Sequence, residues 1–168
     1  MMTAKDILSR RNSISQEQAQ RAVSADMPVL EVIPRLLDSP KRILRVNSGR
    51  DVVGIIDESS LLEGIGRMIA PRDDCSILTV ECAPYDYSAS RIAHAVEDSD
   101  AHLVDMWSVP AGDGHLRVTL RVRRSDPTPT VHSLERYGYD VVEVHGSDYG
   151  DGELAATRLL ELQTLLNV

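Results

Sequence analysis

The 168-residue sequence contains no phenylalanine and only one tryptophan, and aromatic side chains make up just 4% of it. This scarcity argues against an RNA-recognition domain, because such sheets stack bases on aromatic residues. The two cysteines, Cys75 and Cys82, are too few for a four-thiolate iron–sulfur cluster, and no CxxC motif occurs. Both lie in one expected strand with their side chains on opposite faces, so neither a disulfide nor a shared metal is expected.

Long apolar runs are also missing. No stretch approaches the roughly 18 apolar residues of a membrane-spanning helix. The N-terminal MMTAKDILSRR lacks the apolar region of a secretory signal. Lys and Arg number 18 against 26 Asp and Glu, and most of the resulting net charge of −8 lies after residue 70. We therefore expect a cytoplasmic protein with neither a membrane nor a nucleic-acid partner.

Sequence signatures of catalysis are absent as well. The chain contains no GxSxG, P-loop, GxGxxG or HExxH motif, and its five histidines form no i,i+4 pair. Asp57 and Glu58 are neighbours, so on a helix they would point about 100° apart rather than form an acid–base pair. Asp86, Ser88 and His94 do not make a convincing triad, because Ser88 stands where a helix cap is expected. The sequence predicts a protein that is not an enzyme and holds no metal or resident cofactor.

The patterns that are present predict an α+β fold in two units, separated at APRDD (70–74). In the first unit, Ser15 and Gln18 suggest a capping box that starts a short helix through Val23. Residues 28–38 have a helical apolar pattern that Pro34 should kink or shorten. Further elements are a strand at 42–47, a strand at 51–57 and a helix capped by Asp57, with an apolar face of Leu61, Leu62, Ile65, Met68 and Ile69.

The second unit has a regular β-α-β-β-α-β pattern, typical of the ferredoxin-like fold. The predicted strands are 76–82, 102–109, 115–123 and 139–145. One helix is capped by Asp86 or Ser88 and turns Ala89, Ile92, Ala93 and Val96 inward. The other starts at Asp126-Pro127 and ends near Gly138. A leucine-rich helix at 151–168 follows, which either packs on its own domain or forms a dimer contact.

Four arginines gather along the strand at 115–123, where apolar and polar residues alternate without exception. Arg117, Arg121 and Arg123 share its outer face, and Arg124 follows directly. Two interpretations stay open for this basic stripe. Either the arginines form a solvated sheet face or pair with acidic residues across the strands, or they attract an anionic ligand or an acidic surface of a dimer mate.

The second unit also resembles the ACT domain, a regulatory module, over residues 75–146. APYDYSASRIAHAVEDSDAHLVDMWSV is similar to the family's first strand end, helix and second strand, and DPTPTVHSLERYGYDVV to its second helix and last strand. The resemblance implies a dimer that binds a small metabolite, often an amino acid, near the loop after the first strand. The implied site residues are Tyr85, Asp86, Tyr87 and Ser88. The family's usual acidic-Pro-Gly sequence is absent from this loop.

The first unit resembles a cystathionine-β-synthase (CBS) domain over about residues 23–69. VSADMPVLEVIPRLL (23–37) is similar to the entry strand and first helix, and DVVGIIDESSLLEGI (51–65) to the last strand and helix. The resemblance implies an adenosyl ligand such as AMP, ATP or S-adenosylmethionine. The implied ligand-binding residues are Val52, Gly54, Asp57 and Ser60. Asp57 and Ser60 occupy positions where the family usually has Thr and Asp.

The resulting domain organisation is an N-terminal helical segment (1–22), a CBS-like module (23–70), an ACT-like domain (75–146) and a C-terminal helix (151–168). This combination resembles regulatory proteins of the acetoin-utilisation type with one CBS copy missing. Because CBS modules normally pack in pairs, a single copy implies a homodimer. We expect a non-catalytic, ligand-sensing regulator; the alternative is a structural or partner-binding homodimer whose ligand sites have been lost.

Overall fold

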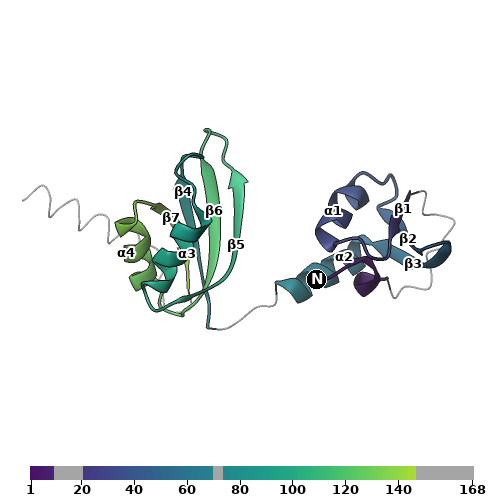
Figure 1. Cartoon of the computed structure of the whole chain (residues 1–168), viewed down its shortest axis with the longest axis horizontal. Coiled ribbons are helices and arrows are strands. Elements are labelled where there is room, and N and C mark those ends of the chain that lie inside the picture. The colour runs from purple at the N-terminus through teal and green to yellow at the C-terminus, as the bar shows by residue number, and fades with distance from the viewer. Residues whose placement is uncertain (10–20, 70–73, 147–168) are drawn as a thin grey trace, which may run out of the picture. The chain divides into compact units, whose positions relative to one another are not determined.

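A computed structural model describes residues 1–9, 21–69 and 74–146. The chain forms an α+β fold of two compact units, Met1–Pro71 (unit 1) and Arg72–Val168 (unit 2), and the boundary falls inside APRDD (Figure 1). No helix among the described residues is long and apolar enough to cross a membrane. The predicted C-terminal helix at 151–168 lies outside the described residues.

Unit 1 contains a mixed three-stranded sheet with two helices. Its elements are the 3-10 helix η1 (Ala4–Ile7), β1 (Arg21–Ser24), α1 (Val29–Leu37), β2 (Ile43–Ser48), β3 (Asp51–Asp57) and α2 (Glu58–Met68). The strand order is β1-β2-β3, with β1 parallel to β2 and β3 antiparallel to it. The turn of the β2–β3 hairpin uses Gly49 at φ +61°, a conformation that favours glycine.

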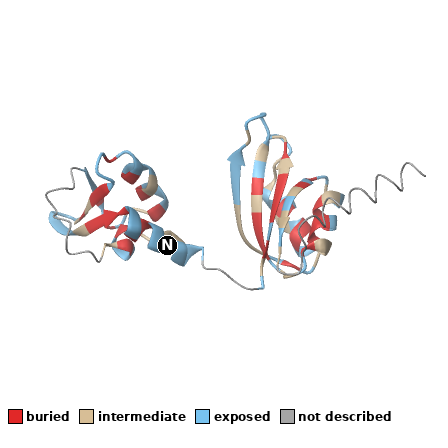
Figure 2. Ribbon diagram, turned by 180° about the vertical axis from the view of Figure 1, so that it is seen from behind, coloured by how far each residue is buried: buried red, intermediate tan, exposed pale blue. Residues whose placement is uncertain are grey.

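The core of unit 1 lies on one face of this sheet. Leu44, Val46 and Ile56 of the strands are fully buried there, with Val32 of α1 and Leu61 of α2 packed against them. Both helices therefore cover the same face of the sheet, and buried residues mark that side in Figure 2. On the opposite face, only a small separate cluster of Ile43 and Ile55 is buried.

One sequence expectation for the helices of unit 1 needs correction. Leu62, Met68 and Ile69, which we expected on the inner face of α2, are 70%, 45% and 40% exposed. Their side chains lie outside the stripe that Leu61 and the buried Gly64 bring to the core. Pro34 is accommodated because α1 ends at Leu37, one turn later, as a shortened helix.

The predicted helix running through Val23 is wrong at its end, because Arg21–Ser24 form β1. Val23 is 4% exposed and lies beside Val46 of β2 in the parallel register. The pairing with a strand more than twenty residues away overrides the local helical pattern. The start of that helix, Ser15 to Gln18, lies outside the described residues.

Unit 2 has the predicted element order β-α-β-β-α-β. Its elements are β4 (Ser76–Cys82), α3 (Ala89–Glu97), β5 (His102–Pro110), β6 (Leu116–Arg123), α4 (Thr128–Arg136) and β7 (Asp140–His145). They form a four-stranded sheet in the order β5-β6-β4-β7, in which all neighbours are antiparallel. Figure 1 shows α3 and α4 together on one side of it.

The core of unit 2 lies between this sheet and its two helices. Val118, Leu120 and Val122 of β6 are fully buried, as the alternating pattern predicted. In α3, Ile92 and Val96 are buried as expected, but Ala89 is exposed and Ala95 takes an inward position instead. Ala89 is the first residue of the helix, where the chain has not yet reached the core.

The ends of α4 differ slightly from expectation. Pro127, rather than Asp126, is the N-cap residue, although the Asp126 carboxylate accepts a hydrogen bond from the Thr128 amide at 3.0 Å. Asp126 therefore satisfies a free amide of the first turn from one position further out. Gly138, at φ +86°, follows the C-terminus of the helix as predicted.

Candidate functional site

The junction between β3 and α2 is built around two residues that cap each other. The Ser60 amide donates to Asp57 Oδ1 at 2.8 Å, and the Asp57 amide donates to Ser60 Oγ at 3.0 Å. This is a reciprocal capping box at the start of α2, and it confirms Asp57 as the predicted N-cap. Both residues are 6% exposed. Their polar atoms are thus engaged in holding the helix terminus.

The N-terminal segment lies against the same junction. Ser9 Oγ donates to Asp57 Oδ2 at 2.9 Å, and the Ser9 amide donates to the Ile55 carbonyl at 2.8 Å. Leu8 packs over Gly54, where a Cβ atom would stand 3.1 Å from Leu8 Cδ2. Both oxygens of the Asp57 carboxylate therefore accept hydrogen bonds from within unit 1.

The four implied CBS-like site residues are only partly brought together. Asp57 and Ser60 are in direct contact, whereas Gly54 lies under Leu8 and Val52 lies opposite Asn47 near the hairpin turn. Val52 is 38% exposed. The structure thus places two of the four residues at one junction and spreads the other two along β3.

A pocket of about 320 Å³ opens beside Ser60, between η1 and α2. Its lining comprises Asp6, Ile7, Leu8, Ser60, Glu63, Gly66 and Arg67. The Arg67 guanidinium donates to the Asp6 carbonyl at 2.7 Å across one side of it. Hydrogen bonds from the Thr3 amide and hydroxyl lower the pKa of Asp6, so this carboxylate is charged at neutral pH. Sequence reasoning missed the contribution of η1, because only the fold brings residues 6–8 to α2.

In unit 2, the implied ACT-like residues of the loop after β4 point in different directions. Tyr85 is 88% exposed, whereas Tyr87 packs against the core. Ser88 is the N-cap of α3, and its hydroxyl accepts a hydrogen bond from the Arg91 amide at 3.4 Å. The Asp86 amide donates to the Ala83 carbonyl at 3.0 Å and closes a turn.

The arginine stripe of β6 is paired with acidic residues. Arg117 donates two hydrogen bonds to Glu81 Oε1, at 3.0 and 2.6 Å. Arg121 donates two to Asp105 Oδ2, and Arg123 lies 3.6 Å from Asp74. The pairing with acidic residues of neighbouring segments is therefore confirmed for Arg117, Arg121 and Arg123, whereas Arg124 donates to the Ser99 carbonyl.

Three buried side-chain atoms of the described residues have no hydrogen-bond partner, namely Arg45 Nε, Asn47 Oδ1 and Asp105 Oδ1. Arg45 and Asn47 are half-buried and stand two residues apart on β2. Sequence reasoning did not select Asn47. The available signal was the alternation of Ile43-Leu44-Arg45-Val46-Asn47, in which polar residues share one face of a central strand.

Among the described residues, no group of His, Cys, Asp and Glu is arranged to hold a metal ion. Burial, with a smaller effect of Asp86, raises the pKa of the Cys82 thiol. No protein-family model matches the chain, and no curated protein matches it either.

Proposed function

We propose that the chain is a non-catalytic, ligand-sensing regulatory protein that works as a homodimer, with a CBS-like unit 1 and an ACT-like unit 2. The observation that carries the proposal is the strand arrangement of the two units. In unit 1, a parallel and an antiparallel neighbour flank β2, and α2 starts directly at the end of β3. In unit 2, the order β5-β6-β4-β7 is that of a ferredoxin-like sheet. Fold alone does not assign a function, so the ligand needs a direct test.

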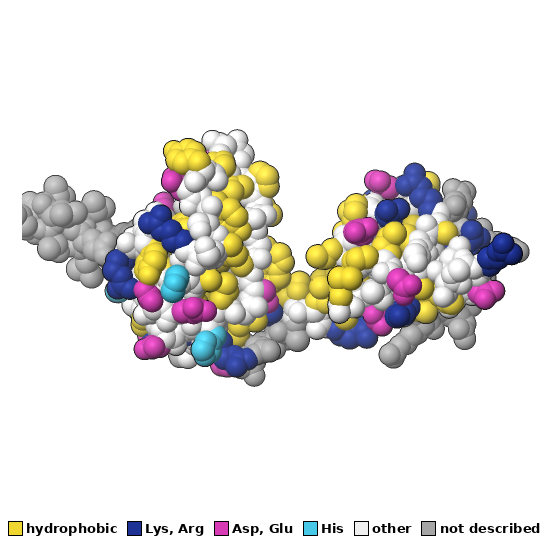
Figure 3. Space-filling model, viewed as in Figure 1, with side chains coloured by type: hydrophobic (Ala, Val, Ile, Leu, Met, Phe, Trp, Pro, Cys, Tyr) yellow, Lys and Arg dark blue, Asp and Glu magenta, His cyan; other side chains and the backbone are white. Residues whose placement is uncertain are grey.

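The exposed apolar residues of unit 1 support the homodimer. Leu30 and Leu37 of α1 are 68% and 57% exposed and stand seven residues apart, on one helical face. Leu62 of α2 and Ile69, its C-cap residue, have the same spacing and are 70% and 40% exposed. Figure 3 shows hydrophobic side chains gathered over these two helices. Such apolar patches mark association surfaces, and a two-fold dimer would cover the patch with its own copy.

The ligand proposed for unit 1 is an adenosyl compound such as AMP, ATP or S-adenosylmethionine, and for unit 2 a small metabolite. The pocket beside Ser60 supports a ligand near the start of α2. A second candidate function, a structural or partner-binding homodimer without ligands, is favoured by the capping box, because Asp57 and Ser60 already satisfy each other. Both candidates share the dimer and differ in whether a metabolite binds.

A thermal-shift screen of the full chain separates the two candidates. AMP, ADP, ATP, S-adenosylmethionine and the amino acids are tested one at a time. A ligand present at about 100 times its Kd raises the free energy of unfolding by about 2.7 kcal/mol. We therefore expect at least one of these compounds to raise the Tm clearly. If no compound raises Tm, the ligand-free dimer is the better description.

Light scattering tests the homodimer. We expect the mass of two chains, and Leu62→Glu should reduce it to that of one because a buried charge opposes the apolar contact. Val109→Glu is the matched control, since Val109 is also an exposed apolar residue (53%) but lies on β5 of unit 2. If the native chain has the mass of a monomer, the proposed dimer is wrong. If Val109→Glu reduces the mass to that of one chain, the dimer contact lies in unit 2.

A further inference from the structure

The pocket beside Ser60 is lined by side chains of both charges. Asp6 belongs to η1, whereas Glu63 and Arg67 stand four residues apart on α2 and therefore project from one face of this helix. All three residues are exposed, so that solutes can reach the charges from solvent. The volume of about 320 Å³ lies at the lower end of the roughly 300–1,000 Å³ that is typical of small-molecule sites. The pocket therefore suits a small, charged ligand.

The opposite charges of this lining are not paired with one another. Within the described part of the chain, the Arg67 guanidinium makes one hydrogen bond, to the Asp6 backbone carbonyl at 2.7 Å, and lies within ion-pair distance of no carboxylate. That bond holds the guanidinium at the pocket and leaves its other N–H donors available. The Glu63 carboxylate has neither a hydrogen bond nor an ion pair with a described residue. In Asp6, the Thr3 amide and hydroxyl occupy Oδ2 only, and Oδ1 can still accept.

A ligand that complements this lining must carry both charges. A simple anion such as phosphate would be repelled by Asp6 and Glu63, and a simple amine would leave the Arg67 donors without an acceptor. An α-amino acid meets both requirements, because its ammonium and carboxylate groups are attached to a single carbon atom and can contact oppositely charged side chains of one small pocket. Ile7 and Leu8 supply the apolar part of the lining, which favours an amino acid with an apolar side chain.

We infer that this pocket of unit 1 binds a free α-amino acid. The Asp6 and Glu63 carboxylates accept hydrogen bonds from the ligand ammonium group, and the Arg67 guanidinium donates to the ligand carboxylate. Hydrogen bonds between charged groups are roughly twice as strong as neutral ones, which gives this arrangement both affinity and selectivity for the zwitterion. The inference goes beyond the function proposed above, because that function assigns only an adenosyl compound to unit 1. It needs nothing from Ser60, whose hydroxyl remains engaged with Asp57.

Calorimetric titration of the full chain with L-leucine and two analogues tests this inference. Isocaproate is leucine without the ammonium group, and isoamylamine is leucine without the carboxylate. We expect L-leucine to bind, and each analogue to bind at least about tenfold more weakly, because each loses one set of charge-assisted hydrogen bonds. Equal affinity for all three compounds would overturn the inference.

Two variants match the groups of the ligand to their partners in the pocket. Glu63→Gln and Arg67→Gln each remove one charge and keep a polar side chain. In Glu63→Gln, L-leucine should lose most of its advantage over isocaproate but keep its advantage over isoamylamine, because only the ammonium contact is weakened. In Arg67→Gln, the pattern should be reversed. A purely structural effect of either variant would weaken the binding of all three compounds alike, and that result would contradict the inference.

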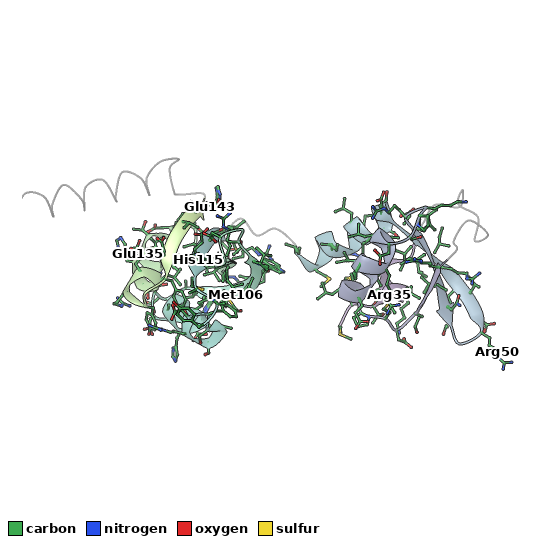
Figure 4. The ribbon with its side chains drawn as sticks, turned by 90° about the horizontal axis from the view of Figure 1, so that it is seen from above. Arg35, Arg50, Met106, His115, Glu135 and Glu143 are labelled. Carbon is green, nitrogen blue, oxygen red and sulfur yellow. The ribbon has the colours of Figure 1, made fainter. Side chains whose placement is uncertain are left out.

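Two control variants remove the same charges outside the pocket. Glu31 is an exposed residue of α1, and Arg50 is an exposed arginine at the tip of the β2–β3 hairpin, pointing away from unit 1 (Figure 4). Glu31→Gln and Arg50→Gln should each change the affinity for L-leucine less than about twofold. Circular dichroism of each variant establishes that lost binding is not lost folding.

The outcomes separate this inference from the proposed function. If Asp86→Asn, in the loop after β4, removes L-leucine binding and Glu63→Gln does not, the amino-acid site lies in unit 2. The inference then fails, while the ligand-sensing function stands. If L-leucine does not bind the native chain, the inference also fails, and the adenosyl arm of the thermal-shift screen decides the proposed function independently.

Discussion

Gly64 of α2 lies directly against Ile7 of η1: a Cβ atom on Gly64 would stand 2.2 Å from Ile7 Cγ2. Ile7 is 1% exposed and belongs to the core of unit 1. The absence of a side chain at position 64 is therefore what allows η1 to pack on α2. Ile7 also lines the pocket beside Ser60, so its packing against Gly64 bears on the candidate site as well.

Gly64→Ala should destabilise unit 1 by about 1–2 kcal/mol, because the overpacking outweighs the better helix propensity of alanine. Gly66→Ala is the matched control in the same helix, where a Cβ would meet nothing within 4 Å. There the propensity gain should dominate, and stability should rise by roughly 0.5–1 kcal/mol. Urea unfolding followed by far-ultraviolet circular dichroism measures both changes; destabilisation by both variants would contradict the steric argument.

The distribution of aromatic residues provides an internal reference for this measurement. All five tyrosines and the only tryptophan lie after residue 84, whereas residues 1–71 contain none. Trp107 is in β5, so its fluorescence reports on unit 2 alone. The Gly64→Ala variant should shift the dichroism transition of unit 1 and leave the Trp107 transition unchanged.

Asp57→Ala should cost unit 1 about 1–2 kcal/mol, since it removes the N-cap of α2 and the acceptor of the Ser9 hydroxyl. Ser60→Ala should cost less, and the double variant less than the sum, because the two residues form one capping box. Ser59→Ala, at an exposed neighbouring position, should change stability by less than about 0.5 kcal/mol. Strict additivity of Asp57→Ala and Ser60→Ala in urea unfolding would contradict this coupling.

Asp105→Ala should destabilise unit 2 more than Glu81→Ala does. The Arg121 and Asp105 side chains are 10% and 24% exposed, so removing the carboxylate leaves a largely buried guanidinium without this partner, at a cost of about 2–3 kcal/mol. Arg117, the partner of Glu81, is 47% exposed, and water replaces the lost contact at a cost below about 1 kcal/mol. Urea unfolding monitored by Trp107 fluorescence gives both values, and equal losses would show that burial does not govern these pairs.

Protonation of the Asp126 carboxylate should contribute to the loss of stability of unit 2 in acid. Hydrogen bonds from the Thr128 side chain and amide lower the pKa of Asp126 below its ordinary value of 3.8. A lowered folded-state pKa stabilises the fold above pH 3.8, and this contribution is lost as pH falls through the folded-state pKa. The stability difference between the native chain and Asp126→Asn should therefore be constant near neutrality and shrink below about pH 4. If the stability difference between the native chain and Asp126→Asn increases in acid, the predicted direction of the pH dependence is wrong.

Much of the fold could be predicted because alternation and capping are local signals. The bounds of β3 and β4 agree with the sequence prediction at both ends, and Asp57 and Ser88 cap helices as expected. Strand β1 was implied only by the resemblance to a CBS domain; the local pattern predicted a helix there, because Val23 is its only buried residue and no alternation is visible in four residues. Apolar side chains on α2 could not be assigned to the core or the surface, because sequence does not reveal which neighbours are available.

The sequence by itself determined the succession of helices and strands after residue 28 and the position of the separator between the two units, because periodicity, turn residues and caps act within a few residues. The tertiary structure decided which polar groups face one another. It engaged Asp57 with Ser60 and Ser9, paired the β6 arginines with acids, and left Arg45 Nε and Asn47 Oδ1 buried without partners among the described residues. These relations depend on strand register and on contacts between distant segments, which local patterns do not encode.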